Sequence, residues 1–379
     1  MAKNENLHKA KDAKNDEFYT LLSSVSEELR HYKQHFAAKI VFCNCDDPTW
    51  SAFWRYFHLN FAELGLKKLI STHYDRTEPT YKMEYEGGDD NDVEVGVKTP
   101  LEGNGDFRSQ ECLNLLDECD IVVTNPPFSL FREFVGTLME HDKKFIIWGN
   151  NNAITYKEFF PLLKENKVWL GYTANKTCTF RVAEGYRFDE KLTAQFNDGH
   201  KYGKVPAISI FTNLDIQKRH EKLILWQRYY DDNGNPLPDA EERYPHYDNY
   251  DAINVDRVAD IPVDYRDVMG VPITFLDKYN PKEFEILGYT GGLGWNNQNN
   301  IKTTKEYLEC KQHNPDGSIT SGGKVNTGAA LCFSEIPAQR YYSASNCDGY
   351  LLRTYGRILI KTSRENPRLQ SWDERRQVK

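Results

Sequence analysis

Four adjacent residues, Asn125, Pro126, Pro127 and Phe128, combine an amide, two rigid rings that lack N–H donors, and an aromatic face. Each proline fixes its own φ angle and drives the preceding residue toward an extended conformation. The segment therefore presents the side-chain oxygen of Asn125 and backbone carbonyl oxygens as acceptors, beside the Phe128 ring. This set suits a planar heterocycle with an exocyclic amino group, whose nitrogen it would orient for in-line attack on an electrophile. The alternative is a strand-terminating turn with a core phenylalanine.

The elements that must position this loop form an alternating pattern. Short apolar runs predict strands, and amphipathic stretches between them predict helices. The first strands are predicted at 39–45, 67–72, 120–124 and 143–149, and later ones at 167–172, 178–182 and 207–214. Helices are predicted at 23–39, 49–65, 108–119 and 129–141, and a hairpin at 81–86 and 93–98. The pattern predicts an α/β domain whose mostly parallel sheet is covered on both faces, with its ligand at the carboxyl ends of the strands.

The composition of the sequence changes near residue 216. Helical periodicity fades there, and the share of Pro, Asn, Asp, Gly and Tyr increases. We therefore expect two domains, residues 1–215 and 216–379. The net charge of −8 counts against a protein that wraps nucleic acid, although the N-terminal arm and the C-terminal tail are locally basic. No apolar run is long enough to span a membrane and no signal peptide is present, so a cytoplasmic protein is expected. The eight scattered cysteines favour reduced thiols.

At this point the sequence resembles a family. Asn-Pro-Pro-Phe after a strand is similar to the catalytic motif of S-adenosylmethionine-dependent amino methyltransferases of the adenine-N6 type. Longer blocks resemble the EcoRI-type adenine-specific DNA methyltransferases, among them LHKAKDAKNDEFYT, YKQHFAAKIVFCNCDDP, GDFRS, DIVVTNPPFSLF, KENKVWLG, YDNYDAINV and RILIK. The resemblance runs from the N-terminal arm to about residue 285 and resumes near residue 357, leaving about 290–355 unmatched.

The resemblance implies a Rossmann-like class I methyltransferase sheet with helices on both faces, plus a C-terminal loop-rich target-recognition region. It also implies transfer of a methyl group from S-adenosylmethionine to a flipped-out adenine in a short site of double-stranded DNA. Asn125 and the Pro126 carbonyl would orient the amino group, and Phe128 would stack on the base. Such enzymes are commonly paired with a restriction endonuclease.

The same resemblance implies the residues that hold the cofactor. Phe18, Tyr19 and Thr20 would close over its methionine end. Asn44 and Asp46 follow the first strand, where a carboxylate would bind the ammonium group, and Asp47 is a candidate helix cap. This segment lacks the glycines usual at the first strand. Asp106 would accept the amino group of the cofactor adenine, with Phe107 stacked on the ring, unless Asp106 is a helix N-cap and Phe18 to Thr20 pack at a helix entry. Asp75 is a late candidate for the ribose.

Other readings stay open. The chain could act on cytosine N4 or on an RNA base, or it could bind nucleic acid with a decayed cofactor pocket. Cys310, His313, Cys332 and Cys347 could be drawn as a zinc site, but their spacing is irregular and we predict no metal. Cys43 and Cys45 alternate along the first strand, which predicts burial. Asn, Gln and Lys around Trp295 are residue types that read base edges, and the unmatched region predicts a recognition sequence different from those of relatives.

Overall fold

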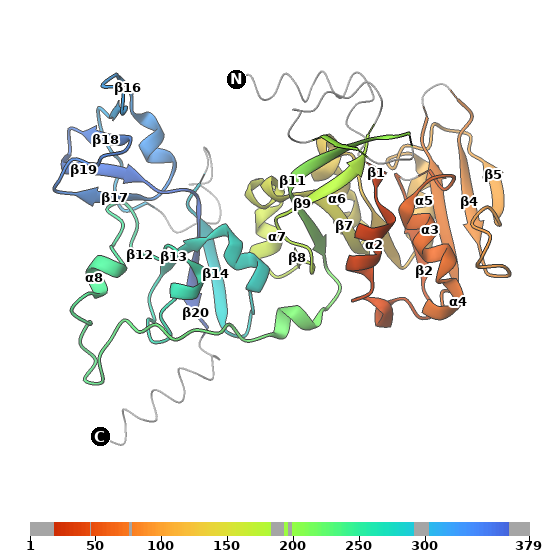
Figure 1. The fold of residues 1–379 in the computed structure, drawn as a ribbon, viewed down its shortest axis with the longest axis horizontal. Helices are drawn as coiled ribbons and strands as arrows, with labels where there is room; N and C mark the ends of the chain where they lie inside the picture. Colours follow the sequence, from red (N-terminus) through yellow and green to blue (C-terminus); the bar gives the residue numbers. More distant parts are fainter. Residues whose placement is uncertain are drawn as a thin grey trace. The chain divides into compact units, whose positions relative to one another are not determined.

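The computed structural model describes residues 19–45, 47–75, 78–182, 193–195, 199–291 and 303–363. The chain divides into two compact units (Figure 1). Unit 1 comprises Met1–Leu163 and Lys167–Ile216, and unit 2 comprises Lys164–Asn166 and Gln217–Lys379. Within the described ranges, no helix has the length and apolar character needed to cross a membrane.

Unit 1 is built on an 11-stranded sheet. Four parallel strands form its centre, in the spatial order β7-β6-β2-β3. Their bounds are Lys144–Asn150 for β7, Ile121–Thr124 for β6, Ile40–Cys43 for β2 and Lys68–His73 for β3. These are the four strands predicted first along the chain, and each prediction is confirmed to within a few residues.

Antiparallel strands flank this centre on both sides. Beside β7 lie β11 (Lys201–Thr212), β9 (Lys176–Arg181) and β1 (Tyr19–Thr20), and beside β3 lie β4 (Tyr81–Tyr85) and β5 (Val97–Pro100). The short strands β8 (Trp169–Leu170) and β10 (Thr193–Gln195) pair with β11. The prediction of a mostly parallel sheet is correct for the centre and wrong for the flanks. On the β4–β5 side the connections are too short for a crossover, which leaves antiparallel pairing, whereas β7 and β11 are joined by a long segment that contains α7, β8 and β9.

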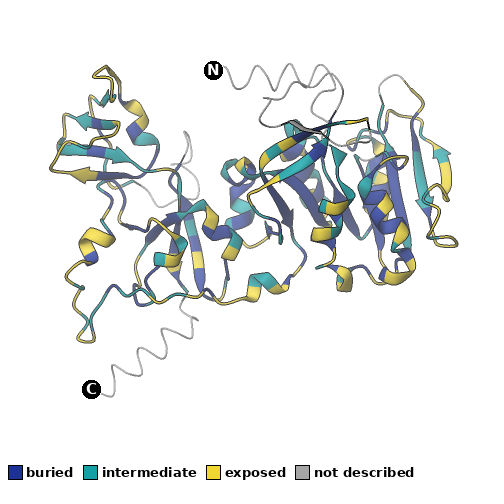
Figure 2. Ribbon diagram, viewed as in Figure 1, coloured by how far each residue is buried: buried dark blue, intermediate teal, exposed yellow. Residues whose placement is uncertain are grey.

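Helices cover both faces of this sheet, which is why every residue of β2 and β6 is buried (Figure 2). On one face, α2 (Leu22–Leu29), α3 (Ala52–Leu59) and α4 (Phe61–Leu64) share a core cluster with strand residues such as Val41 and Val123. On the other face lie α5 (Gln110–Glu118) and α6 (Phe131–Glu140), where the Phe131 ring lies 5.5 Å from that of Phe211 on β11. The short helix α7 spans Phe160–Lys164.

The helix predicted at 23–39 is wrong beyond its first half. It ends at Leu29, and the chain continues through a turn into a 3-10 helix, Lys33–His35. Tyr32 stays buried without helical geometry because its hydroxyl donates a hydrogen bond to Glu28 Oε1 at 2.7 Å. Tyr32 is therefore buried by a side-chain hydrogen bond, although its spacing in the sequence suggested that a continuous helix buries it.

Unit 2 holds two smaller sheets among loops, as its composition suggests. One has the order β12-β13-β20-β14, with bounds Ile253–Asn254, Met269–Pro272, Arg357–Thr362 and Phe284–Tyr289. The other has the order β16-β15-β18-β19-β17, with bounds Ile319–Ser321, Lys311–His313, Tyr341–Ala344, Cys347–Arg353 and Ala330–Phe333. The helix α8 spans Ala240–Arg243. Trp295 and its polar neighbours up to residue 302 lie outside the described residues.

Candidate active site

The loop Asn125–Phe128 begins where the buried strand β6 ends. Asn125 is half-buried, and its Oδ1 atom is shielded from solvent. Pro126 is buried, while Pro127 has an extended backbone (φ −52°, ψ 124°) and its carbonyl accepts the Leu130 amide at 2.9 Å. Phe128 opens a 3-10 helix that leads into α6. The loop is therefore rigid, and it is anchored in a fully buried strand.

This loop lies at the point where the order of the parallel strands reverses. Strand β2 pairs with β3 on one side and with β6 on the other, although the chain runs from β2 to β3 first. The two strand ends are tied together because Thr124 Oγ1 donates a hydrogen bond to the Asn44 carbonyl. Open sheets of this kind bind ligands in the crevice at such a reversal. Asn44 and Asn125 are the first residues beyond the two strands that border it.

Asn44 is 2% exposed, and within the described residues its Oδ1 atom has no hydrogen-bond partner. A buried acceptor in this state is costly unless a ligand satisfies it. Cys45 follows with φ +66°, a left-handed conformation that glycine adopts most easily. Cys45 is thus beyond the strand and half-buried, which corrects its predicted burial within the strand, whereas Cys43 is buried as predicted. Asp46 lies outside the described residues.

Asp47 has a structural role. Its Oδ2 atom lies 2.9 Å from His73 Nδ1 at the end of β3, and its Oδ1 atom accepts the Tyr81 hydroxyl at 2.9 Å. The same Oδ1 accepts the amide and hydroxyl of Thr49 at 2.9 and 2.8 Å. Helix α3 is capped instead by Ser51, whose Oγ accepts from two amides of the first turn. Asp47 thus closes the turn before the helix and joins the ends of β2 and β3.

The residues of the N-terminal motif that can be described form strand β1, not a helix entry. Thr20 pairs with Phe180 of β9, and the Phe180 ring lies 6.5 Å from that of Phe128. Tyr19 packs against Trp50, with ring centroids 4.1 Å apart. Strand β1 therefore brings the N-terminal motif beside the loop after β2 and near the loop Asn125–Phe128. Phe18 lies outside the described residues.

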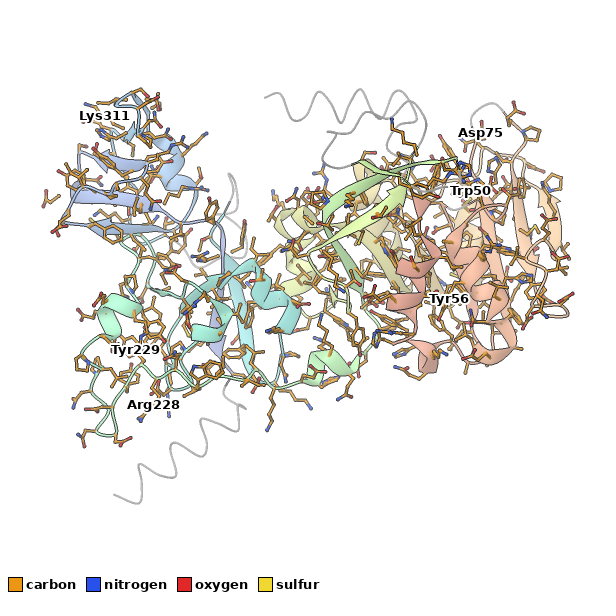
Figure 3. All side chains as sticks on the ribbon, viewed as in Figure 1. Trp50, Tyr56, Asp75, Arg228, Tyr229 and Lys311 are labelled. Atoms are coloured by element: carbon orange, nitrogen blue, oxygen red, sulfur yellow. The ribbon has the colours of Figure 1, made fainter. Side chains whose placement is uncertain are left out.

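Thr20 adds a second buried polar atom to this end of the sheet. Its Oγ1 is shielded from solvent and, within the described part of the chain, forms no hydrogen bond. Trp50 is 43% exposed, and Figure 3 labels it and Asp75 near the same end of unit 1, with Tyr56 of α3 farther from that end. The position of Trp50, an aromatic residue close to the Asn-Cys-Asp-Asp turn, is the signal in the sequence that could have indicated this placement.

Asp106 and Phe107 lie before α5 and are held by their neighbours. Asp106 is not the helix cap, because the Ser109 side chain accepts the amide of Cys112 at the helix start. The Asp106 carboxylate instead accepts Arg108 Nε at 2.8 Å and Nη2 at 2.6 Å. The Phe107 ring is buried, and it lies 5.1 Å from that of Phe134.

Arg108 is the residue that sequence reasoning missed at this position. Its guanidinium also bonds Glu133 at 3.1 Å. The hydrogen bond to Asp106 is the main cause that raises the pKa of Arg108 above its ordinary value, and Glu133 adds to it. The Asp-x-Arg spacing could have suggested this pair. Since each carboxylate oxygen accepts more than one bond, Asp106 is oriented by Arg108 and can still accept a ligand amino group.

The segment before Asp106 is pressed against the end of β3. Gly105 has φ +73°, and a Cβ atom there would lie 2.3 Å from the His73 carbonyl oxygen. The Asp75 amide donates to the Asn104 carbonyl at 3.2 Å, and the Asp75 carboxylate accepts the Glu78 amide at 3.1 Å. Asp75 and Asp106 are therefore brought to the same end of β3. A side chain at position 105 would push them apart.

The hypothetical zinc residues do not form one cluster. Cys332 Sγ and Cys347 Sγ lie 3.4 Å apart, but His313 bonds Ser343 Oγ at 2.9 Å and stacks on Tyr341. Among the described residues, no group of three or more His, Cys, Asp or Glu side chains is placed to hold a metal ion.

Comparison with known proteins shows the family of the chain. Residues 6–362 match the family model described as "Adenine-specific methyltransferase EcoRI". The chain belongs to this family. It is thus an adenine-specific methyltransferase, and the resemblance seen in the sequence is confirmed. No solved structure matches the chain.

Three similar proteins are all named as type II methyltransferases. The type II methyltransferase M.EcoRI of Escherichia coli is 45% identical over 308 residues, which cover 77% of this chain and 91% of that protein. The type II methyltransferase M.MpnI of Mycoplasma pneumoniae is 42% identical over 282 residues, covering 74% and 84%. A type II methyltransferase of Mycoplasma genitalium, M.MgeORF184P, shows the same identity and coverage.

Proposed function

We propose that the Asn125–Phe128 loop positions the N6 amino group of an adenine in a short site of double-stranded DNA for methylation by S-adenosylmethionine. Family and relatives make the chain a site-specific DNA adenine methyltransferase of the restriction-modification type. The observation that carries the proposal for the site is the placement of this rigid loop at the strand-order reversal, one residue beyond β6.

The fold we propose is the Rossmann-like class I methyltransferase sheet. The support is the strand order β11-β7-β6-β2-β3, in which four parallel strands carry an antiparallel β11 at one side. The loops after β2, β3 and β6 then share one edge of the sheet. Asn44 and Asn125, to which we assign roles in binding cofactor and substrate, follow two of these strands directly.

The adenine must leave the DNA stack to reach this loop, at a cost of a few kcal/mol. Its two amino protons would be accepted by Asn125 Oδ1 and the Pro126 carbonyl oxygen. The half-buried Phe128 ring, supported from behind by Phe180, would stack on the base. Pro127 holds the backbone extended, so that both acceptors keep their direction during the reaction.

S-adenosylmethionine supplies an electrophilic methyl group when bound. The buried Asn44 Oδ1 is suited to accept from its ammonium group, and the Thr20 hydroxyl is suited to its carboxylate. Tyr19, with Phe18 and Asp46 in the adjoining segments, completes the methionine end of the proposed site. Asp106, oriented by Arg108, would accept the adenine amino group of the cofactor, and Phe107 would line the ring.

We assign residues 1–215 to cofactor binding and catalysis and residues 216–379 to recognition of the DNA target. A cytoplasmic enzyme that protects DNA against a paired restriction endonuclease is the setting that fits a type II relative. All eight cysteines are free thiols, in keeping with a reducing compartment.

The test is methyl transfer from labelled S-adenosylmethionine to unmethylated plasmid DNA, with the product mapped by modification-sensitive sequencing. We expect label on adenine N6 at one recurring short site, lost in Asn125→Ala and kept in the control Asn114→Ala, an exposed change on α5. Calorimetry should show that Asn125→Ala still binds the cofactor. Label on cytosine N4 would point to the cytosine alternative. Cofactor binding without transfer to DNA would point to RNA or another substrate, and the absence of both transfer and cofactor binding would point to a decayed pocket.

A further inference from the structure

One face of the five-stranded sheet in unit 2 carries a row of rings that the catalytic site does not use. His313 on β15 pairs with Tyr341 on β18, and Phe333 on β17 pairs with Tyr350 on β19. These four residues, named here the aromatic row, cross four neighbouring strands. Ile319 extends the row onto β16, since it pairs with His313.

The rings of the aromatic row contact one another. His313 stacks on Tyr341 with centroids 4.5 Å apart and planes 5° apart, and Tyr341 meets Tyr350 edge to face at 5.4 Å. The His313 Nε2 atom also lies 2.9 Å from Ser343 Oγ, which fixes the ring across the strands. The row is therefore a preorganised surface, and a flat ligand would meet it at a small entropic cost.

The opposite face of the sheet supplies the core. Tyr342 and Leu351 pair across β18 and β19 and are buried in a cluster with Val325 and Ala330. Because side chains alternate along a strand, the neighbours of Tyr342 and Leu351 point away from that cluster. Tyr341 and Tyr350 are half-buried, Phe333 is 38% exposed and Ile319 is 60% exposed. The rings of the row are thus partly accessible, while Leu331, two residues before Phe333 on the same face of β17, is buried in a second cluster.

Cations border this surface on a chain whose net charge is −8. Lys311, labelled in Figure 3, is exposed two residues before His313, and Arg340 is exposed directly before Tyr341. Arg340 Nε donates a hydrogen bond to Asn314 Oδ1 at 3.0 Å, which orients the guanidinium group. Exposed acids lie near it as well: Asp348 two residues before Tyr350, Glu335 two residues after Phe333, and Asp316, whose pKa is lowered by hydrogen bonds from Ser318 and in part by Arg340. Rings flanked by Lys and Arg are the composition that binds nucleic-acid strands, with bases on the rings and phosphates on the cations.

We propose that the aromatic row stacks on unpaired bases of the DNA substrate, with Lys311 and Arg340 holding the adjoining phosphates. The inference rests on the proposed function only in taking DNA as the substrate. It assigns a role to a sheet within residues 290–355, a stretch for which the sequence alone suggested no resemblance to the family but which the family model spans. Stacking accepts every base, so the row adds affinity for opened DNA without itself reading sequence.

The experiment measures binding of the full-length protein to two fluorescent single strands of equal length and charge. One is a mixed-sequence oligonucleotide, and the other has abasic sites in place of its central bases. We expect the wild type to favour the strand with bases. The double change Tyr341→Ala and Tyr350→Ala should lower its affinity for that strand roughly 5- to 100-fold and leave the abasic strand nearly unaffected.

Three further variants make the outcome specific. Tyr341→Phe with Tyr350→Phe should restore base-dependent binding, because the rings remain. Tyr355→Ala removes a tyrosine that is 88% exposed outside the row and should change nothing. Lys311→Ala should weaken both strands alike, and it should reduce the dependence of affinity on salt.

Equal binding of both strands by the wild type would overturn the proposal, as would an unchanged preference in a folded double alanine variant. A row that docks a protein or a second copy instead would give that result. Failure here is separable from failure of the proposed function, because the wild type would still methylate plasmid DNA. The melting temperature and cofactor binding of each variant establish that it is folded.

Discussion

Strand pairing fixes the candidate catalytic loop in unit 1, whereas buried polar side chains fix several of the long loops in unit 2. Asn125 follows a strand paired on both sides, with every residue buried. In unit 2, Asn249 donates to the Gly328 carbonyl at 3.0 Å and accepts the Ala330 amide at 2.9 Å. Strand pairing holds a loop in the precise position that catalysis needs. Side-chain hydrogen bonds hold loops whose sequence and length can differ among relatives.

In each unit a buried carboxylate acts in the same way. Asp264, 5% exposed, accepts the amides of Tyr229 and Tyr230 at 2.7 and 3.2 Å. Glu28, 1% exposed, accepts the amides of Tyr172 and Thr173 at 2.8 and 2.7 Å. Asp264 ties a loop to a loop, while Glu28 ties a loop to a helix beside the large sheet. This pair allows the comparison between the units to be tested.

The largest expected effect is on chemistry in unit 1. Asn125→Ala should lower kcat for methyl transfer by about 100-fold or more, because it removes an oriented acceptor that acts in the transition state. The free energy of unfolding should change by less than about 1 kcal/mol, since strand pairing and the two prolines hold the loop. Single-turnover kinetics and urea unfolding measure the two quantities. A large loss of stability would mean that Asn125 supports the loop itself.

The second largest effect is expected from removal of a buried carboxylate that accepts loop amides. Asp264→Ala leaves buried amides without an acceptor and should destabilise unit 2 by about 2–4 kcal/mol. Amide hydrogen exchange should show lost protection at Tyr229 and Tyr230, with cofactor binding retained. Glu28→Ala should instead expose Tyr172 and Thr173. Uniform loss of protection throughout the chain in both variants would contradict separate ties in the two units.

A smaller effect is expected from an ion network at the β3–β4 edge. Glu84 bonds Lys68 at 2.5 Å and Lys82 at 2.7 Å. Burial opposes ionisation of Glu84, but the bonds from the two lysines outweigh it, and the pKa of this carboxyl is lowered. Its stabilisation is therefore present above the unfolded pKa of about 4.3 and is lost as the pH falls further. Glu84→Gln should cost about 0.5–1 kcal/mol at pH 7 and nearly nothing at pH 3.

The difference in stability between wild type and Glu84→Gln, measured by urea unfolding from pH 3 to pH 7, checks this sign. High salt should reduce it. A difference that grew toward acid pH would contradict the direction of the pKa shift.

The smallest effect should come from the thiols. In unit 2 the exposed Cys332 lies 3.4 Å from Cys347, while Cys43, Cys112 and Cys119 of unit 1 are buried. Diamide should therefore join Cys332 to Cys347 and leave the buried thiols reduced. Burial, and then the Cys347 thiol, raise the pKa of Cys332 to about 12, so the reaction should be slow at pH 7 and faster as the pH rises. Peptide mapping with Cys332→Ser as control measures it, and cross-links in unit 1 would contradict it.

Much of unit 1 could be predicted from the sequence because its elements obey local rules. Apolar runs gave β2, β3, β6 and β7, and the double proline placed a loop directly after β6. The family and the enzyme class were also confirmed. The roles assigned to Asn125, Asn44 and Asp106 remain predictions.

What could not be predicted depends on contacts between distant residues. The antiparallel flanks follow from pairing partners, which periodicity does not give. Arg108 binds Glu133 25 residues away, and Asn249 binds Ala330 81 residues away. Neither partner can be found from a window of local sequence. Unit 2 relies on such contacts, and the sequence alone therefore predicts only that it is loop-rich.

The backbone at Cys45 has a consequence for engineering. A non-glycine residue in the left-handed conformation costs roughly 1–2 kcal/mol, which glycine would recover. A thermostability screen would therefore favour Cys45→Gly. The same change would loosen the turn that keeps the Asn44 carbonyl against Thr124 at the edge of the reversal. If Asn44 holds the methyl donor as proposed, we expect Cys45→Gly to make the protein more heat-resistant and to weaken cofactor binding, so that stability and cofactor affinity would be opposed at this one residue.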